Sequence, residues 1–395
     1  MNPVDNPYNP GAGAPPPELA GREPLIERAL ATIKRAKAGR APKSMIMLGL
    51  RGVGKTVLLN KFEQLAEAEG CQTALFEADA ERSLPEMVTP QLHRLLLRLN
   101  VVKRVGHDVQ KAFGQLRAFA GAFKVSIGDV EFGLSNEIAT GDLAVDLTDL
   151  FVVIGEAARA RNAAVAILID EVQSLSRPDL SALIMAMHKI AQRQLPVLMF
   201  AAGLPQLAKL AGDTKSYAER LFDYPPIGQL EEDDARAALT APAEREGVQF
   251  HDDALAHILG ETERYPFFLQ VWGSHAWEVA AHSPITRKDA EEATRRAVAA
   301  LDQGFFHVRF ARLTERQLDY ARALASFGPA GADSAAVAER IGLTVKQAAP
   351  IRDEVIKKGM AYAPTRGEVA FTVPKFDDYL RRKMGETPAK QRIRA

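Results

Sequence analysis

The residues best suited to chemistry stand at Gly49–Thr56, where the letters GLRGVGKT match the pattern G-x-x-x-x-G-K-[ST] of a phosphate-binding loop. Glycines in such a loop let backbone N–H groups turn toward phosphate oxygens, and Lys55 places a positive charge on the β- and γ-phosphates. The hydroxyl of Thr56 is a suitable ligand for Mg²⁺. The sequence therefore predicts a site for ATP and Mg²⁺ made by Gly49, Leu50, Arg51, Gly52, Val53, Gly54, Lys55, Thr56 and Val57.

A second, acidic segment completes the expected site. Residues 164–169 are apolar throughout, which is typical of a buried strand, and Asp170 and Glu171 follow them directly. Asp170 is suited to orient the magnesium, directly or through water, and Glu171 to polarise the water that attacks the γ-phosphate. A strand ending in a solvated acidic turn would look the same, so this interpretation depends on the loop upstream. The predicted catalytic residues are Lys55 and Glu171, and the predicted metal ligands are Thr56 and Asp170.

These motifs stand at the ends of apolar runs that alternate with amphipathic segments. The strand-like runs are residues 45–48, 73–76, 165–169 and 197–202. Between the first two, residues 57–70 have helical spacing and end at a glycine. Such alternation predicts an α/β fold, with a parallel sheet of the P-loop NTPase type covered by helices on both faces. Residues 123–134 instead alternate apolar and polar side chains about a Gly-Asp pair, which predicts an inserted hairpin.

The rest of the chain predicts a modular organisation. Beyond Tyr224 the sequence is rich in Ala and Glu at helical spacing, which indicates a small helical lid domain. Three further helices, and two short strands joined by a turn at 365–368, are typical of a winged helix. The opening residues are rich in Pro and Gly and too poor in apolar side chains to fold alone. The expected divisions are an extended segment at 1–19, an ATPase domain at 20–225, the lid at 226–305, the winged helix at 310–385 and a basic tail at 386–395.

The expected winged helix carries a modest positive bias. Residues 331–395 include 13 Lys and Arg against 8 Asp and Glu, and much of the excess is in residues 381–383 and the tail. Basic side chains on the third helix and the wing tip could contact duplex DNA. The candidate DNA-binding residues are Lys346, Arg352, Lys357 and Arg366. Asp353 and Glu354 interrupt that helix, and Pro350 argues for a bend or a late start. Winged helices also bind proteins, so both kinds of partner stay open.

Together these features resemble the AAA+ ATPases of the origin-initiator branch, found among archaeal and bacterial ATP-binding proteins. The resemblance rests on the loop at Gly49–Thr56, the strand that ends in Asp170-Glu171, the helical domain and the winged helix, and it covers most of the chain. It implies hydrolysis of ATP to ADP and phosphate. Residues 21–23, Gly-Arg-Glu, resemble the segment that opens the ATPase domain of these proteins near the adenine, which makes Arg22 a candidate nucleotide contact.

The same resemblance gives Arg220 a candidate catalytic role. Residues 216–222 stand where related ATPases carry an arginine that reaches the ATP of the next subunit, which implies a homo-oligomer. The alternative is a structural arginine that pairs with Glu219 or in the neighbourhood of Asp223.

Two departures from the family pattern predict slow hydrolysis. The fourth strand usually ends in a polar residue that senses the γ-phosphate, whereas this one reads MFAAG, with Ala202 near its end. The second sensor is usually an arginine at a helix start, for which only Arg264 is available. A related branch, the signal-transduction NTPases, often keeps nucleotide bound and uses turnover as a timer.

Composition narrows the class of protein. The chain has 395 residues, 47% hydrophobic and 25% charged, with 50 basic and 50 acidic residues, so no global field steers it toward nucleic acid or an acidic membrane. Its single cysteine, Cys71, excludes an intramolecular disulfide and is expected to be a buried, small apolar residue. No apolar run nears the ~20 residues that cross a bilayer, and no export signal is visible, so a cytoplasmic location is expected.

Two functions of different classes fit these features. The first is an ATP-dependent switch that couples nucleotide state to DNA binding through the winged helix. The second is a signalling or scaffold ATPase whose winged helix binds protein and whose output is oligomerisation. A steep loss of affinity with salt is expected only if several basic side chains meet DNA phosphates.

Overall fold

A computed structural model describes residues 1–395 except 12, 41, 102–106, 127–138 and 386–395. The described residues form two compact units. One, called the sheet unit below, comprises residues 22–49 and 54–227; the other, the helical unit, comprises residues 1–21, 50–53 and 228–395. No helix in the described part of the chain is long and apolar enough to span a bilayer.

The sheet unit is built on five parallel strands in the order β2-β3-β4-β1-β5. The strands are β1 (Ser44–Leu48), β2 (Gln72–Glu77), β3 (Val165–Asp170), β4 (Val197–Gly203) and β5 (Phe222–Asp223). Every residue of β3 and β4 is buried, as expected of continuous apolar strands covered on both faces. The predicted α/β fold with a parallel sheet is confirmed. Because the strands are parallel, the carboxyl ends of β1, β3 and β4 lie at one edge.

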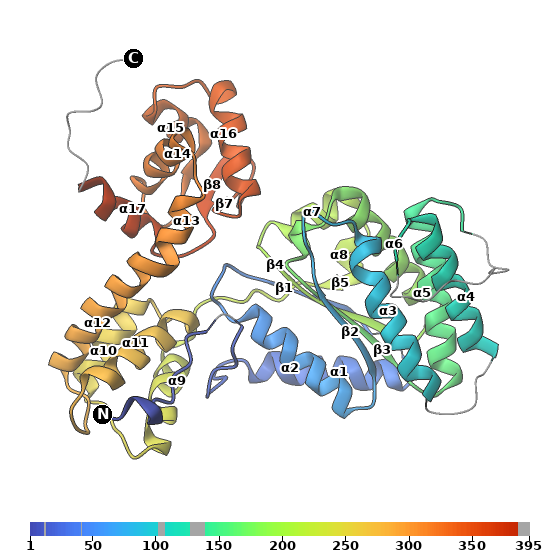
Figure 1. Ribbon diagram of the computed structural model, residues 1–395, viewed down its shortest axis with the longest axis horizontal. Coiled ribbons are helices and arrows are strands. Elements are labelled where there is room, and N and C mark those ends of the chain that lie inside the picture. The colour runs from blue at the N-terminus through green and yellow to red at the C-terminus, as the bar shows by residue number, and fades with distance from the viewer. Residues whose placement is uncertain (12, 41, 102–106, 127–138, 386–395) are drawn as a thin grey trace. The chain divides into compact units, whose positions relative to one another are not determined.

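Helices cover both faces of this sheet (Figure 1). The helices of the sheet unit are α1 (Glu23–Lys37), α2 (Lys55–Ala68), α3 (Leu84–Val101), α4 (His107–Ala122), α5 (Leu143–Ala160), α6 (Arg177–Gln192), α7 (Leu207–Thr214) and α8 (Ala218–Leu221). On one face, with α1 and α2, the ring of Phe62 packs on that of Phe200 with centroids 5.0 Å apart. Val165 and Ile167 of β3 belong to the core on the other face, with α3, α5 and α6.

Cys71 is buried as predicted, and burial raises the pKa of its thiol to about 11.

Three helices, α3 to α5, fill the segment between β2 and β3, where only a hairpin is predicted from the sequence. Of that hairpin at 123–134, residues 123–126 close the end of α4 as a turn in which Val125 N–H donates to Ala120 O at 2.8 Å. Residues 127–134 lie outside the described residues. The buried positions of α5 include all of residues 150–155, so the middle of α5 is buried around its whole circumference.

The helical unit contains a helical bundle followed by a second, smaller fold. The bundle comprises α9 (Glu232–Arg245), α10 (Asp252–Thr262), α11 (Pro266–Val279), α12 (Arg287–Leu301), a π-helical turn (Asp302–Phe306) and α13 (His307–Ala311). The smaller fold comprises α14 (Glu315–Ala325), β6 (Ala332–Asp333), α15 (Ser334–Arg340), α16 (Val345–Lys357), β7 (Ala361–Tyr362), β8 (Glu368–Phe371) and α17 (Phe376–Gly385). Its strands form an antiparallel sheet in the order β6-β8-β7. Three helices and a hairpin in this order are the arrangement of a winged helix.

The third helix of the winged helix, α16, begins at Val345 and not later in the sequence. Thr344 and Gln347 form a capping box at its start, which satisfies backbone N–H groups that the first turn leaves free. Pro350 lies inside the helix, so the late start that proline suggested is wrong.

One hydrophobic core runs through the bundle and the winged helix. Phe306, in the π-helical turn, lies against Phe376 and Tyr379 of α17, with ring centroids 5.9 and 5.5 Å apart. Phe310 of α13 meets Tyr379 edge to face at 5.9 Å. Aromatic contacts of this kind add directional packing to the burial of apolar area, so the two parts of the helical unit are held together as one body.

The N-terminal residues lie along the bundle. Tyr8 is buried, and its hydroxyl donates to Leu239 O at 2.5 Å. Trp277 Nε1 donates to Asn2 O at 2.8 Å. This segment is too poor in apolar side chains to make a core of its own, and Tyr8 joins the core of the bundle instead.

Candidate nucleotide-binding site

The loop predicted to bind phosphate joins β1 to α2 at the carboxyl edge of the sheet. Gly49 N–H donates to Gly203 O, at the end of β4, over 3.0 Å, which fixes the start of the loop to the sheet. Gly52 and Gly54 have φ values of +85° and +91°, in the left-handed region that favours glycine. A Cβ on Gly54 would meet nothing within 4 Å, so the backbone conformation, not lack of space, requires glycine there. Since Gly54 is the N-cap of α2, the helix dipole favours an anion at this point.

The two predicted magnesium ligands lie together. Thr56 Oγ1 donates to Asp170 Oδ2 at 2.6 Å, and Asp170 Oδ1 accepts from Glu171 N–H at 2.8 Å. Asp170 is only 7% exposed, and Lys55, the first residue of α2, is 6% exposed. A hydroxyl and a carboxylate are hard oxygen ligands of the kind that Mg²⁺ prefers, and nucleotide phosphates and water usually complete its coordination. The residues present therefore fit this cation.

Glu171 follows with a left-handed backbone, φ 50° and ψ 37°. Its carboxylate accepts a hydrogen bond from Gln173 Nε2, while Gln173 Oε1 accepts from Leu204 N–H at 3.0 Å. Gln173 is a site residue that the sequence motifs do not predict. From the sequence alone, a polar residue two positions after Glu171 gives no indication of a role in the site. Its role becomes visible only when the structure places the end of β4 beside it.

The other predicted nucleotide contacts lie in the loop, in the first turn of α2 and at the start of α1. Arg22 lies at the N-cap of α1 and makes no side-chain cap hydrogen bond. Leu50, Arg51 and Val53 lie in the loop, where Val53 is buried. Val57 is partly exposed in the first turn of α2. Their contacts with nucleotide stay predictions.

Arg220 lies in the short helix α8 and is exposed. Within the described ranges, no ion pair involves its guanidinium, and the nearby Asp223 pairs with Arg28 instead. Tyr217 stacks on His188 of α6 with ring centroids 4.2 Å apart, which attaches the start of α8 to the sheet unit. The described residues therefore do not form the local ion pair that a structural role of Arg220 would require.

Neither expected sensor has its usual form. None of the seven residues of β4, VLMFAAG, has a polar side chain. Arg264 lies in the loop between α10 and α11 with φ +59°, before α11 begins at Pro266. Glu263 and Arg264 both adopt left-handed conformations after α10, and Arg264 directly precedes Tyr265, the N-cap of α11, so its role as a sensor stays a prediction.

The four candidate DNA-binding residues differ in their surroundings. Lys346, Lys357 and Arg366 are exposed. Arg352 instead donates to Asp353 Oδ1 through Nε and Nη2, at 3.1 and 2.9 Å. Its charge is therefore offset by a neighbouring carboxylate, which leaves three residues suited to meet phosphate.

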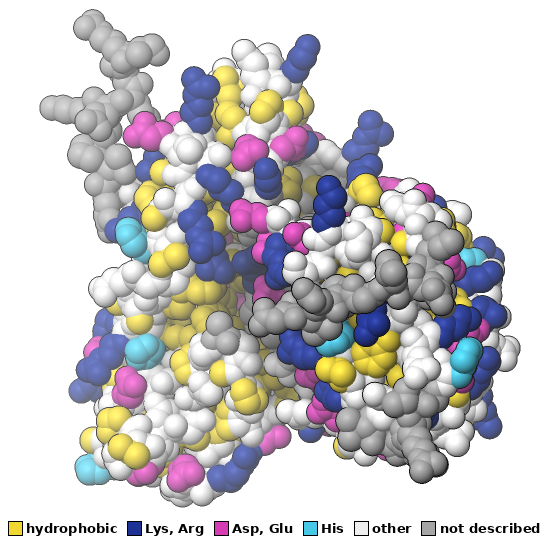
Figure 2. All heavy atoms as spheres, turned by 45° about the vertical axis from the view of Figure 1, so that its right-hand side comes forward, with side chains coloured by type: hydrophobic (Ala, Val, Ile, Leu, Met, Phe, Trp, Pro, Cys, Tyr) yellow, Lys and Arg dark blue, Asp and Glu magenta, His cyan; other side chains and the backbone are white. Residues whose placement is uncertain are grey.

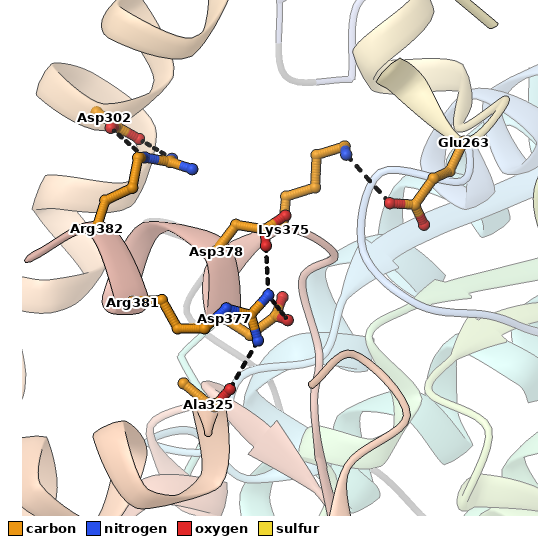
Figure 3. A network of polar contacts seen from close by, with 8 residues as sticks. All are labelled: Glu263, Asp302, Ala325, Lys375, Asp377, Asp378, Arg381 and Arg382. Carbon is orange, nitrogen blue, oxygen red and sulfur yellow. Dashed lines mark hydrogen bonds and ion pairs between the residues drawn. The ribbon is translucent and has the colours of Figure 1, made fainter. Parts of the chain in front are cut away.

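Ion pairs also engage basic residues near the end of the described chain (Figure 3). Arg382 Nη2 lies 2.6 Å from Asp302 Oδ1, which joins α17 to the π-helical turn. Lys375 Nζ lies 3.1 Å from Glu263 Oε1 at the end of α10. Both pairs tie the winged helix to the bundle, and they reduce the charge available to an external partner.

Arg381 is similarly engaged within the winged helix. It pairs with Asp377 Oδ2 at 2.9 Å and with Asp378, and its Nη1 donates to Ala325 O at 2.8 Å. Burial, and then the charge of Asp378, raise the pKa of Asp377, whereas Arg381 opposes that shift.

On the face shown in Figure 2, Lys and Arg are interspersed with Asp and Glu and do not gather into one basic patch.

Comparisons with known proteins agree with the motifs of the sheet unit. Residues 18–200 match the family described as AAA ATPase domain. Residues 303–380, which include most of the winged helix, match a family described as a domain of unknown function (DUF8462). No curated protein is a significant match.

Several solved structures are similar to the chain at low sequence identity. The Walker-type ATPase PABY2304 of Pyrococcus abyssi has a TM-score of 0.54 at 14% identity, over 92% of this chain and 96% of that one. The Aeropyrum pernix Orc1 protein, in complex with DNA, has a TM-score of 0.47 at 15% identity, over 93% and 94%. Cdc6p from Pyrobaculum aerophilum has a TM-score of 0.47 at 12% identity, over 98% of each chain.

Replacing Lys55 tests the loop. Lys55→Ala is expected to weaken binding of Mg·ATP about tenfold to a hundredfold, because a charged hydrogen bond to phosphate is lost. Equilibrium titration with a fluorescent ATP analogue measures the affinity. Lys61→Ala, which removes another lysine from α2, is the matched control and should bind as the wild type does. Equal affinities in the two variants would contradict the assignment.

Proposed function

We propose that the chain binds ATP with Mg²⁺, hydrolyses it slowly, and uses the nucleotide state to control contact between its winged helix and duplex DNA. The observation that carries the ATPase part is the convergence of Thr56, Asp170 and Glu171 behind a phosphate-binding loop, within the residues that match the AAA ATPase domain family. Lys55 would neutralise the β- and γ-phosphates. Bound Mg²⁺ would supply further charge neutralisation at the phosphate oxygens, held through Thr56 and Asp170.

Glu171 is the proposed base. Its carboxylate would accept a proton from water as the water oxygen attacks the γ-phosphorus and the bond to ADP breaks. The apolar end of β4 lacks a group that could stabilise the transferred phosphoryl group. We therefore expect turnover slow enough for the bound nucleotide to define a lasting state.

The output is assigned to the winged helix because the bundle and the winged helix share one core and are tied by Arg382–Asp302 and Lys375–Glu263. A rotation of the bundle would therefore carry the winged helix with it. Lys346, Lys357 and Arg366 are the side chains we propose for phosphate contacts, with Lys346 on the first turn of α16.

A second candidate is an ATPase whose winged helix binds protein. It is favoured by Arg352, whose charge is offset by Asp353, and by Val345, which is 51% exposed at the start of α16. An apolar side chain on the exposed third helix suits a protein partner as well as a base edge.

Hydrolysis measured with and without duplex DNA separates the two functions. We expect DNA to stimulate turnover, and the triple variant Lys346→Ala/Lys357→Ala/Arg366→Ala to keep the basal rate while losing the stimulation. With three phosphate contacts, the affinity for DNA should fall about fortyfold between about 50 and about 200 mM salt. A turnover rate that does not change with DNA, or a DNA affinity that does not change with salt, would contradict the DNA function and favour a protein partner.

Arg220 extends the proposal to a homo-oligomer, since its exposed guanidinium could reach the nucleotide of a neighbouring subunit. Arg220→Ala and Glu171→Gln should each be nearly inactive alone. Mixed together they should recover part of the turnover, because some sites then combine an intact Glu171 with an intact Arg220. If a confirmed oligomer recovers none at any mixing ratio, Arg220 does not act between subunits.

A further inference from the structure

The side chain of Gln173 connects the ends of two neighbouring strands in the candidate site. Its Nε2 donates to the Glu171 carboxylate, just past β3, and its Oε1 accepts from Leu204 N–H, just past β4, at 3.0 Å. An amide can donate and accept at once, which is what this bridge between a carboxylate and a backbone N–H requires.

Gly203 makes room for the bridge. A Cβ at Gly203 would lie 2.7 Å from Gln173 Oε1 and 2.7 Å from Leu207 Cδ2, so any other residue would displace the amide or the leucine. The φ of Gly203 is not in the left-handed region, so space and not backbone conformation accounts for glycine here. Gly203 O also accepts from Gly49 N–H at 3.0 Å, so the glycine contacts both the phosphate-binding loop and the bridge.

Within the described part of the chain, no other hydrogen bond or ion pair holds the Glu171 side chain, so the bridge fixes its orientation. Glu171 has left-handed dihedral angles, and its N–H is bonded to Asp170 Oδ1 at 2.8 Å. A hydrogen bond from a neutral amide selects one orientation of the carboxylate. A catalytic base must be held close to one geometry, and an error of about 1 Å can cost about a hundredfold in rate.

We infer that Gln173 is a positioning residue for ATP hydrolysis: it orients the Glu171 carboxylate and supplies, from the 3-10 turn after β3 (Val172–Ser174), the polar group that the end of β4 lacks. This inference rests on the proposed function, since it concerns the base assigned there. The inference also explains why β4 is apolar and ends in a glycine. The amide of Gln173 occupies the space that a polar side chain at the end of β4 would need.

Gln173→Met tests the inference, because methionine has a similar length and volume and cannot make either hydrogen bond. We expect kcat to fall about tenfold or more, as for other supporting hydrogen bonds around a site, while the affinity for Mg·ATP and the thermal midpoint stay close to wild type. Gln192→Met, at the exposed end of α6, is the matched control and should leave kcat unchanged.

A double-mutant comparison separates positioning from a general structural effect. In a Glu171→Gln background, Gln173→Met should lower the residual turnover no further, because the residue it positions is already gone. An unchanged kcat in Gln173→Met, or an equal fall in both backgrounds, would overturn the inference while leaving Glu171 as the base. Wild-type turnover in Glu171→Gln alone would instead overturn the proposed function, and the role of Gln173 with it.

Discussion

The hydrogen bond from Thr56 to Asp170 joins residues 114 positions apart, and the candidate site depends on it. It forms because β1, β3 and β4 are parallel, so that the turn after each one opens at the same edge of the sheet. Glycine at Gly54 and the buried carboxylate of Asp170 then bring the start of α2 against the end of β3. Continuous apolar strands covered by helices are thus the physical condition for placing a lysine, a hydroxyl and two carboxylates together.

The helical unit depends on a different constraint, one core shared between a bundle and a winged helix. Aromatic side chains from the π-helical turn and α17 pack in that core, and ion pairs such as Arg382–Asp302 link the two parts at the surface. The same ion pairs reduce the positive charge of the winged helix. A basic residue that pairs with the bundle is therefore less able to attract an external anion. For this reason the exposed Lys346 and Arg366 indicate the capacity to bind phosphate better than the total charge of the winged helix does.

The sequence predicts the phosphate-binding loop, the strand that ends at Asp170 and the winged helix, because each is a local pattern of fixed spacing. It does not predict α3 to α5, whose apolar positions are shared among several packing partners, or the bridge made by Gln173. Nor does it reveal that Arg382 pairs with Asp302, 80 positions away. Partners of this kind depend on the tertiary fold, and a count of charges along the chain cannot distinguish a paired arginine from a free one.

Amide hydrogen exchange of the full chain, with saturating ATP in the presence of Mg²⁺ or of EDTA, tests most directly the claim that this edge of the sheet binds the nucleotide. The account predicts slower exchange for the amides of residues 49–57 and 170–174 with Mg·ATP, and weaker protection at 170–174 when the cation is removed, because Asp170 acts through it. Unchanged exchange in both segments, with bound nucleotide confirmed in the same sample, would contradict the site and every role assigned to its residues.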